Sequence, residues 1–114
     1  MIGPGHMMSS EEIQVTWESF VAETKTGLVV ADFWAPRCPP SRTQSSIVDR
    51  IAAQLGGKVK IVRCNVDAER DLALAWEIKH VPTLLILKDG VEVRRLTGLR
   101  PESEILVRLE EHLD

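Results

Sequence analysis

Leu28-Val-Val-Ala-Asp-Phe-Trp-Ala-Pro-Arg-Cys-Pro-Pro-Ser41 joins an apolar run to a cysteine at the start of a predicted helix. The run 28–35 is too short for a typical helix and is rich in β-branched and aromatic side chains, so it predicts a strand buried on both faces. After the cysteine, apolar residues recur on one side of a 3.6-residue period: Ile47, Val48, Ile51, Ala52 and Leu55. Gly56 and Gly57 then predict the end of this helix.

Shorter elements are predicted on both sides of this strand and helix. Before them, the alternation of polar and apolar residues over 12–16 indicates a short strand, and Thr16 is predicted to cap a brief helix bearing Trp17, Phe20 and Val21. After them, the pattern predicts a strand, a short helix, two strands and a final helix, over 59–66, 71–77, 83–87, 91–97 and from Pro101.

These elements follow the order βαβαβαββα. Asp89-Gly90 favours a tight type I′ turn between two antiparallel strands, whereas the earlier strand–helix–strand order favours parallel strands. The sequence therefore predicts an α/β fold, with a central mixed β-sheet flanked by helices on both faces.

Length and composition limit the classes of function. The 114 residues fit one compact domain, and the net charge of −3, with both signs mixed along the chain, does not suit a general nucleic-acid binder. No apolar run approaches the roughly 20 residues that a membrane-spanning helix needs. Two cysteines and three scattered histidines are too few for a structural zinc site, so we expect no metal. Together with the charge and the short apolar runs, this predicts a protein with no nucleic-acid or membrane partner. We expect it to be a monomer.

The N-terminal segment is predicted to lie outside the domain. Residues 1–7 contain Gly and Pro without a hydrophobic period and are interpreted as a disordered cloning remnant, which leaves 8–114 as the domain. A basic start followed by an apolar secretory stretch is not seen, which favours a cytoplasmic location.

Cys38 is the candidate nucleophile. A helix N-terminus carries partial positive charge and unpaired N–H groups, and both favour a thiolate over a thiol. Arg37 would act in the same direction if its side chain points toward the sulfur. The alternative is a small buried cysteine, which is difficult to reconcile with an arginine and two prolines beside it.

The segment 32–41 resembles the active-site segment of the thioredoxin family, and Val81-Pro82-Thr83 resembles its cis-proline motif. The resemblance extends from about Leu28 through Leu113. It implies a thioredoxin fold and thiol–disulfide exchange on disulfide-containing protein substrates, with Cys38 as the attacking cysteine. It also implies a thioredoxin reductase-like electron donor and no metal or bound organic cofactor.

Ser41 departs from the Cys-x-x-Cys pattern of the family, because a hydroxyl cannot attack and resolve a mixed disulfide. It is either an engineered replacement that traps targets or a natural feature of a monothiol protein. The sequence also fits two alternatives. One is a monothiol glutaredoxin-like protein, and the other is a thioredoxin-fold peptide-binding module without redox turnover.

Asp32 resembles the buried proton acceptor of thioredoxins, and desolvation should raise its pKa while Arg63 opposes the shift. The alternative is a solvated aspartate at the end of a strand. Pro39 and Pro40 lack the N–H that could bond the sulfur, yet we expect the pKa of the Cys38 thiol to be lowered.

The remaining candidate residues would bind substrate. A cis Val81–Pro82 bond would leave the Val81 backbone free to pair with an extended substrate segment. The candidate substrate-binding residues are Trp34, Arg37, Pro39, Pro40, His80, Val81, Pro82 and Gly98. For Trp34 the alternative role is packing, and for His80 it is simple exposure in a loop. Cys64, in the middle of a predicted strand, is interpreted as buried and inert.

Overall fold

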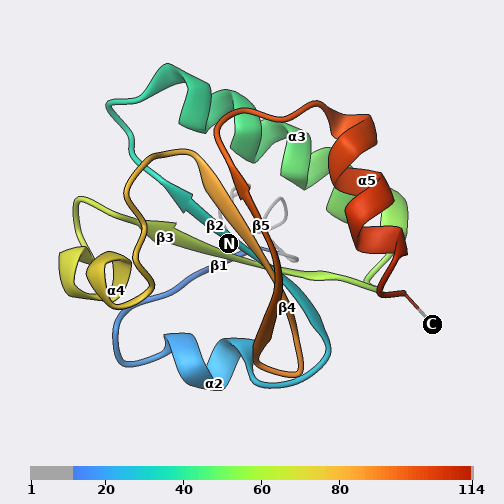
Figure 1. The fold of residues 1–114 in the computed structure, drawn as a ribbon, viewed down its shortest axis with the longest axis horizontal. Helices are drawn as coiled ribbons and strands as arrows, with labels where there is room; N and C mark the ends of the chain where they lie inside the picture. Colours follow the sequence, from blue (N-terminus) through green and yellow to red (C-terminus); the bar gives the residue numbers. More distant parts are fainter. Residues whose placement is uncertain (1–11, 114) are drawn as a thin grey trace, which may run out of the picture.

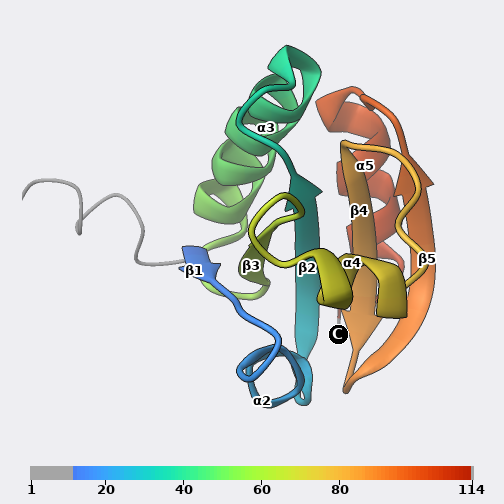
Figure 2. The ribbon, with the colours of Figure 1, turned by 90° about the vertical axis from the view of Figure 1, so that its left-hand side faces the viewer.

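A five-stranded mixed sheet forms the centre of the computed structural model, which describes residues 12–113. The strands lie in the order β1-β3-β2-β4-β5 (Figures 1 and 2). Strands β1 and β2 run parallel to β3, whereas β4 is antiparallel to both β2 and β5. Their bounds are Glu12–Gln14 for β1, Leu28–Trp34 for β2, Lys60–Asn65 for β3, Thr83–Lys88 for β4 and Val91–Thr97 for β5.

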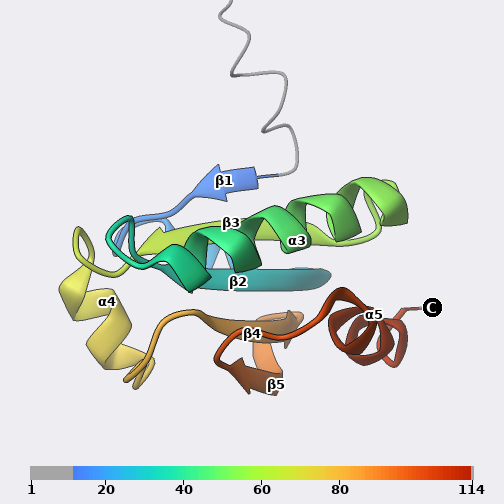
Figure 3. The same cartoon turned by 90° about the horizontal axis from the view of Figure 1, so that it is seen from above.

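Helices cover both faces of this sheet. In Figure 1, α3 and α5 lie above the sheet, and α2 and α4 lie below it. Figure 3 shows α3 running along β2 and β3. The helices are α2 at Phe20–Thr24, α3 at Pro39–Leu55, α4 at Arg70–Ala75 and α5 at Glu102–Glu110. The element order and the helices on both faces confirm the predicted fold class.

The sheet separates two hydrophobic cores, and β2 contributes to both. Val30 faces the core under α3 and α5, where it joins Ile51 and Ile105. Val29 and Phe33 face the other core, which contains Phe20 of α2 and Leu72 of α4. Because successive side chains of a strand point to opposite faces, a strand covered on both sides is expected to be apolar at nearly every position, and Asp32 is the exception in β2. This explains why 28–34 shows no alternation.

Two turns occur at the positions that the sequence predicts. Gly56 ends α3 in a left-handed conformation, with φ of 59°, and its N–H bonds to the carbonyls of Ala52 and Ala53. Asp89 and Gly90 both have positive φ, 50° and 84°, as a type I′ turn requires. Both turns were predicted, and the second fixes the antiparallel pairing of β4 with β5.

The start of α2 differs from the prediction. The helix begins at Phe20, and its N-cap residue is Ser19 rather than Thr16. Thr16 closes the preceding turn: its carbonyl accepts the N–H groups of Ser19 and Phe20, and its Oγ1 accepts the Ser19 N–H at 3.3 Å. Trp17 and Val21 are exposed, and only Phe20 of the three predicted apolar residues enters the core. The predicted remnant at 1–7 lies outside the described residues, and no helix within 12–113 is long and apolar enough to cross a membrane.

Candidate active site

Cys38 lies where the chain leaves the central strand β2 and enters α3. Its backbone is extended, and it occupies the N-cap position, with Pro39 and Pro40 as the first helical residues. Proline is compatible with these positions because their N–H groups would have no helical partner. The N–H of Ser41 bonds to the Cys38 carbonyl at 3.0 Å and closes the first turn. The cysteine is therefore held at the end of a helix, and it is partly exposed.

The cis-proline segment lies directly opposite this cysteine. The Cys38 thiol donates to the Val81 carbonyl, with a distance of 3.8 Å between Sγ and O, and the Val81–Pro82 peptide bond is cis. Gly98 completes the arrangement, because its N–H bonds to the Pro82 carbonyl at 2.8 Å. The cis-proline segment thus contacts both the Cys38 sulfur and Gly98, which are far apart in the sequence.

The pKa of the Cys38 thiol is lowered from its ordinary value, as the sequence predicts. The main cause is Ser41, first through its hydroxyl and then through its backbone N–H; partial burial opposes the shift. Arg37 and Arg42 contribute less, through their charge. The direction expected for Arg37 is thus confirmed, although its contribution is smaller than that of Ser41.

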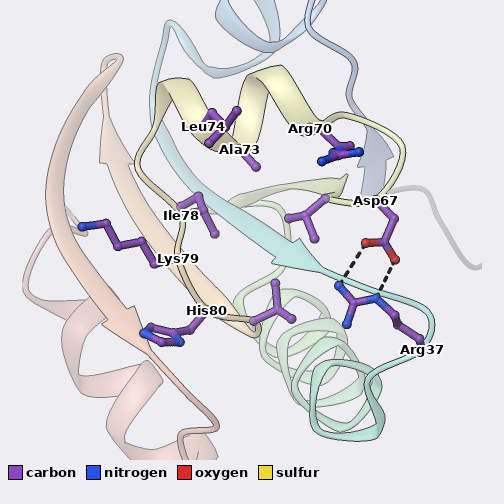
Figure 4. Close-up of a pocket in the computed structure, with 10 residues that line it drawn as sticks. Arg37, Asp67, Arg70, Ala73, Leu74, Ile78, Lys79 and His80 are labelled. Atoms are coloured by element: carbon purple, nitrogen blue, oxygen red, sulfur yellow. Dashed lines mark hydrogen bonds and ion pairs between the residues drawn. The ribbon is translucent and has the colours of Figure 1, made fainter.

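Arg37 is held by Asp67 instead. Its Nε and Nη2 atoms donate to the two carboxylate oxygens at 3.1 and 3.0 Å, in the fork geometry typical of an arginine–carboxylate pair (Figure 4). Asp67 follows β3, and Arg37 follows β2. These two parallel strands are neighbours, so their carboxyl ends meet at the same edge of the sheet.

Ser41 is fully buried one turn into α3. Its Oγ has no hydrogen-bond partner within residues 12–113, which is uncommon for a buried hydroxyl. The Cys38 sulfur is the neighbour whose charged form this hydroxyl favours. Position 41 is thus a small, buried site close to the candidate nucleophile.

Asp32 is also fully buried, so the alternative of a solvated aspartate is wrong. Its Oδ2 accepts from Arg63 Nε at 2.9 Å and from Ser45 Oγ at 2.6 Å. Arg63 additionally pairs with Asp49 at 3.1 Å. Burial raises the pKa of the Asp32 carboxyl, while the Arg63 guanidinium and the Ser45 hydroxyl oppose the shift. The effects of burial and of Arg63 were both predicted from the sequence.

Sequence reasoning missed Ser45 and Asp49. Both lie on α3, and together with Ser41 they recur every four residues, a spacing that places polar side chains on one face of a helix. That face meets the sheet at Arg63, a buried cation in β3. The four-residue spacing was the signal that could have identified them.

The other candidate residues surround Cys38 at different depths. Pro39 and Pro40 are exposed on the first turn of α3, and His80 is exposed just before the cis peptide. The His80 carbonyl accepts from Thr83 Oγ1 at 2.6 Å, which fixes the backbone of this loop. Trp34 is half-buried at the end of β2, and its Nε1 atom is shielded from solvent without a partner in the described chain.

A pocket of about 540 Å³ opens beside the nucleophile, between α4 and the cis-proline loop (Figure 4). Arg37 and Val81 belong to its lining, so it is continuous with the surroundings of Cys38. Apolar side chains from the turn after β3, from α4 and from the loop after α4 line it as well: Val66, Ala73, Leu74 and Ile78. Sequence reasoning did not identify this pocket, because its lining comes from four separate segments.

Cys64 is buried in β3, and burial raises the pKa of its thiol to about 12. Both Cys38 and Cys64 are free thiols. The burial of Cys64 confirms its interpretation as a core residue, and the raised pKa of its thiol agrees with low reactivity. Among the residues that the structure describes, no group of three or more His, Cys, Asp or Glu side chains could hold a metal ion.

Comparison with known proteins agrees with this geometry. The family model described as Thioredoxin matches residues 9–111. The chain belongs to the thioredoxin family. It is 37% identical to the thioredoxin of Bacillus subtilis over 101 residues, which cover 89% of this chain and 97% of that protein. It is 39% identical to thioredoxin 1 of Nostoc sp. over 106 residues, covering 91% and 99% of the two chains.

The thioredoxin fold is also shown by a solved structure. A mutant thioredoxin from Halobacterium salinarum superposes with a TM-score of 0.84 at 27% identity, covering 91% of this chain and 92% of that chain. Thioredoxins are thiol–disulfide oxidoreductases that act on disulfide substrates and are reduced by thioredoxin reductase. This chain is accordingly a thiol–disulfide oxidoreductase of the thioredoxin family.

Proposed function

We propose that this chain is a protein disulfide reductase in which Cys38 attacks target disulfides and Ser41 stops the cycle at the mixed disulfide. One observation supports this proposal most directly. A partly exposed thiol with a lowered pKa lies at the start of α3, and a fully buried serine lies one turn further on, where the family's motif has a second cysteine.

The reaction begins when the Cys38 thiolate attacks one sulfur of the target disulfide. A new bond forms between Cys38 Sγ and that sulfur, and the target's S–S bond breaks. The other target sulfur leaves as a thiolate and takes a proton from solvent. Cys38 is thereby oxidised to the mixed disulfide while the leaving cysteine is reduced, so the electrons balance.

Resolution of the mixed disulfide needs a second thiol. The Ser41 hydroxyl is not nucleophilic enough to displace the Cys38 sulfur, so the complex persists until an external thiol attacks it. In a chain with cysteine at position 41, Asp32 would accept the proton of that buried thiol. With serine there, the carboxylate of Asp32 has no proton to accept in this step.

Substrate binding would use the backbone beside the cis-proline. The Val81 segment lies against the Cys38 sulfur at 3.8 Å, and an extended target segment can pair with its remaining polar groups by strand addition. Gly98, Trp34, Pro39, Pro40 and His80 would border this segment. A thioredoxin reductase-like donor and a cytoplasmic location belong to the same proposal, as does a monomeric state.

Insulin reduction in the presence of dithiothreitol tests the proposal. The chain as given and its Ser41→Cys variant are compared side by side, and we expect rapid reduction only by the variant. A Cys38→Ser, Ser41→Cys double variant is the matched control, because it keeps one thiol in the same segment and should be inert. If Ser41→Cys is also inert, the disulfide reductase proposal is wrong.

Alkylation of Cys38 distinguishes the peptide-binding alternative. Capture of a disulfide-containing target should disappear when the thiol is blocked, because the proposed complex is covalent. A binding module without redox chemistry would keep most of its affinity after alkylation. Formation of a mixed disulfide with glutathione in preference to proteins would instead favour the monothiol glutaredoxin-like alternative.

A further inference from the structure

The pocket beside Cys38 carries an excess of positive charge, although the protein as a whole is acidic. Its lining includes three fixed cations, Arg37, Arg70 and Lys79, against one carboxylate, Asp67. The net charge of the whole chain is −3. The positive lining is therefore a local property of this site, and nearby acidic side chains such as Glu69 and Glu77 do not belong to it.

The cations in the lining differ in their availability. Arg37 is engaged in the two hydrogen bonds with Asp67, so these charges largely offset each other. Arg70 and Lys79 have no side-chain ion pair within the described part of the chain. Figure 4 shows Arg70 on the same side of the pocket as the Arg37–Asp67 pair, and Lys79 on the opposite side.

The position of the pocket connects it to the reaction. Arg37 directly precedes Cys38, and the Val81 carbonyl lies 3.8 Å from the reactive sulfur. A target segment that pairs with the Val81 backbone would continue past the pocket at about 3.3 Å per residue. A side chain within a few residues of the attacked cysteine can therefore enter it. Its methylenes would contact Ile78 and Ala73, and its end would reach Arg70.

We propose that this pocket selects targets with Asp or Glu close to the attacked cysteine, with Arg70 as the main specificity-determining residue. The inference rests on the proposed function and names the substrate class of that site. A carboxylate suits the pocket because it complements the unpaired guanidinium, whereas a lysine would meet like charge. Asp67 limits the preference, since it competes with the incoming carboxylate for Arg37.

Two matched peptides test the proposal with the chain as it exists. Each contains one cysteine activated as a 2-thiopyridyl disulfide, flanked by Glu in one peptide and by Gln in the other. Attack by Cys38 on the peptide sulfur forms a mixed disulfide, breaks the activated S–S bond and releases pyridine-2-thione. The rate follows the absorbance of the thione, and mass spectrometry identifies the product.

We expect the Glu peptide to react about two- to fivefold faster at low salt, the range typical of a partly exposed charge pair. The ratio should approach one in about 1 M salt, where the screening length falls to about 3 Å. Arg70→Gln should reduce the ratio toward one, and Asp67→Asn, which releases Arg37, should increase it. Arg50→Gln removes an equivalent charge from α3 outside the pocket and should leave the ratio unchanged.

The outcomes separate this inference from the proposed function. Release of thione from neither peptide would overturn the proposed function and this inference with it. Equal rates for the two peptides would overturn only the acidic preference, because Cys38 would still be attacking disulfides. A ratio that is unchanged by Arg70→Gln, or that does not increase in Asp67→Asn, would show that this pocket does not carry the preference.

Discussion

Replacement of Arg63 by methionine tests the buried charges beneath the active site. The Arg63 side chain is 5% exposed and that of Asp32 is 0% exposed, and they meet at 2.9 Å. Methionine fills similar volume but leaves the Asp32 carboxylate buried without its cation. Loss of one partner of a buried ion pair costs about 3–5 kcal/mol. The Ser45 hydroxyl still donates to the carboxylate at 2.6 Å, so we expect the lower part of that range.

The loss of stability in Arg63→Met should depend on pH, and the direction of this dependence follows from the pKa of Asp32. Burial raises its pKa above the ordinary value of 3.8, and removal of Arg63 takes away the largest opposing influence. A carboxyl whose pKa is higher in the folded state destabilises the fold only above its unfolded value, increasingly as pH rises. The Arg63→Met defect should therefore be largest at neutral pH and shrink as pH falls toward 3.8.

Urea unfolding, followed by tryptophan fluorescence at pH 7 and pH 5, measures this difference. At neutral pH, a loss of about 3 kcal/mol corresponds to a melting temperature about 12 °C lower for a domain of this size. Asp32→Asn in the Arg63→Met background should restore most of the stability, because the unpaired charge is gone. Asp49→Asn is the control, since that carboxylate is 50% exposed and its pairing is worth under about 1 kcal/mol. Equal losses at both pH values, without rescue by Asp32→Asn, would refute the electrostatic explanation.

Three further outcomes are expected. Ser41→Ala should raise the pKa of the Cys38 thiol, because the hydroxyl is the largest of the influences that lower it; alkylation by iodoacetamide at pH 7 should become slower. Cys64 should resist the same reagent in the folded protein, because burial raises its pKa to about 12, and should react in urea. Gln44→Leu should destabilise the fold by about 1–3 kcal/mol in urea unfolding, since it removes two hydrogen bonds, at 3.1 and 2.8 Å, to the backbone of Arg100.

Each of these three predictions would be contradicted by a specific result. Unchanged alkylation kinetics in Ser41→Ala would mean that the helix terminus and the arginines control the thiol. Labelling of both cysteines without denaturant would contradict the burial of Cys64. Gln54, exposed on the same helix, provides the control for Gln44: Gln54→Leu should change stability by no more than about 0.5 kcal/mol. Equal effects of the two substitutions would show that the Arg100 contacts add nothing.

The sequence predicted those features that depend on local periodicity and turn chemistry. The apolar run of β2, the 3.6-residue period of α3 and the glycine that ends it are local patterns, and the structure confirms them. The wrong prediction near Thr16 has the same origin. Thr16 and Ser19 are both good capping residues, and each accepts the other's N–H through its hydroxyl, so the local pattern does not decide which of them directly precedes the helix.

Long-range side-chain pairs could not be predicted in this way. Arg37 meets Asp67 across 30 positions, and Gln44 meets the Arg100 backbone across 56. Nothing in a window of neighbouring residues specifies such pairs. The parallel register of β2 and β3, which brings their ends together, produces the first of them. The pairing of Arg37 with Asp67, and the small share of Arg37 in lowering the pKa of the Cys38 thiol, therefore had to come from the structure.

The central position of β2 has a consequence for the choice of targets. This strand is paired along both edges and buried on both faces, and Cys38 follows it by four positions. The reactive sulfur thus lies close to a strand that is paired and covered on all sides, and we expect this part of the molecule to move little. The attacking Cys38 sulfur and the two sulfurs of the target disulfide have to be aligned for exchange. We expect the target segment to make most of the movement that aligns them. Among target disulfides of equal exposure, those in segments that unfold locally should be reduced first. The rate of reduction would therefore depend on the local flexibility of the target protein.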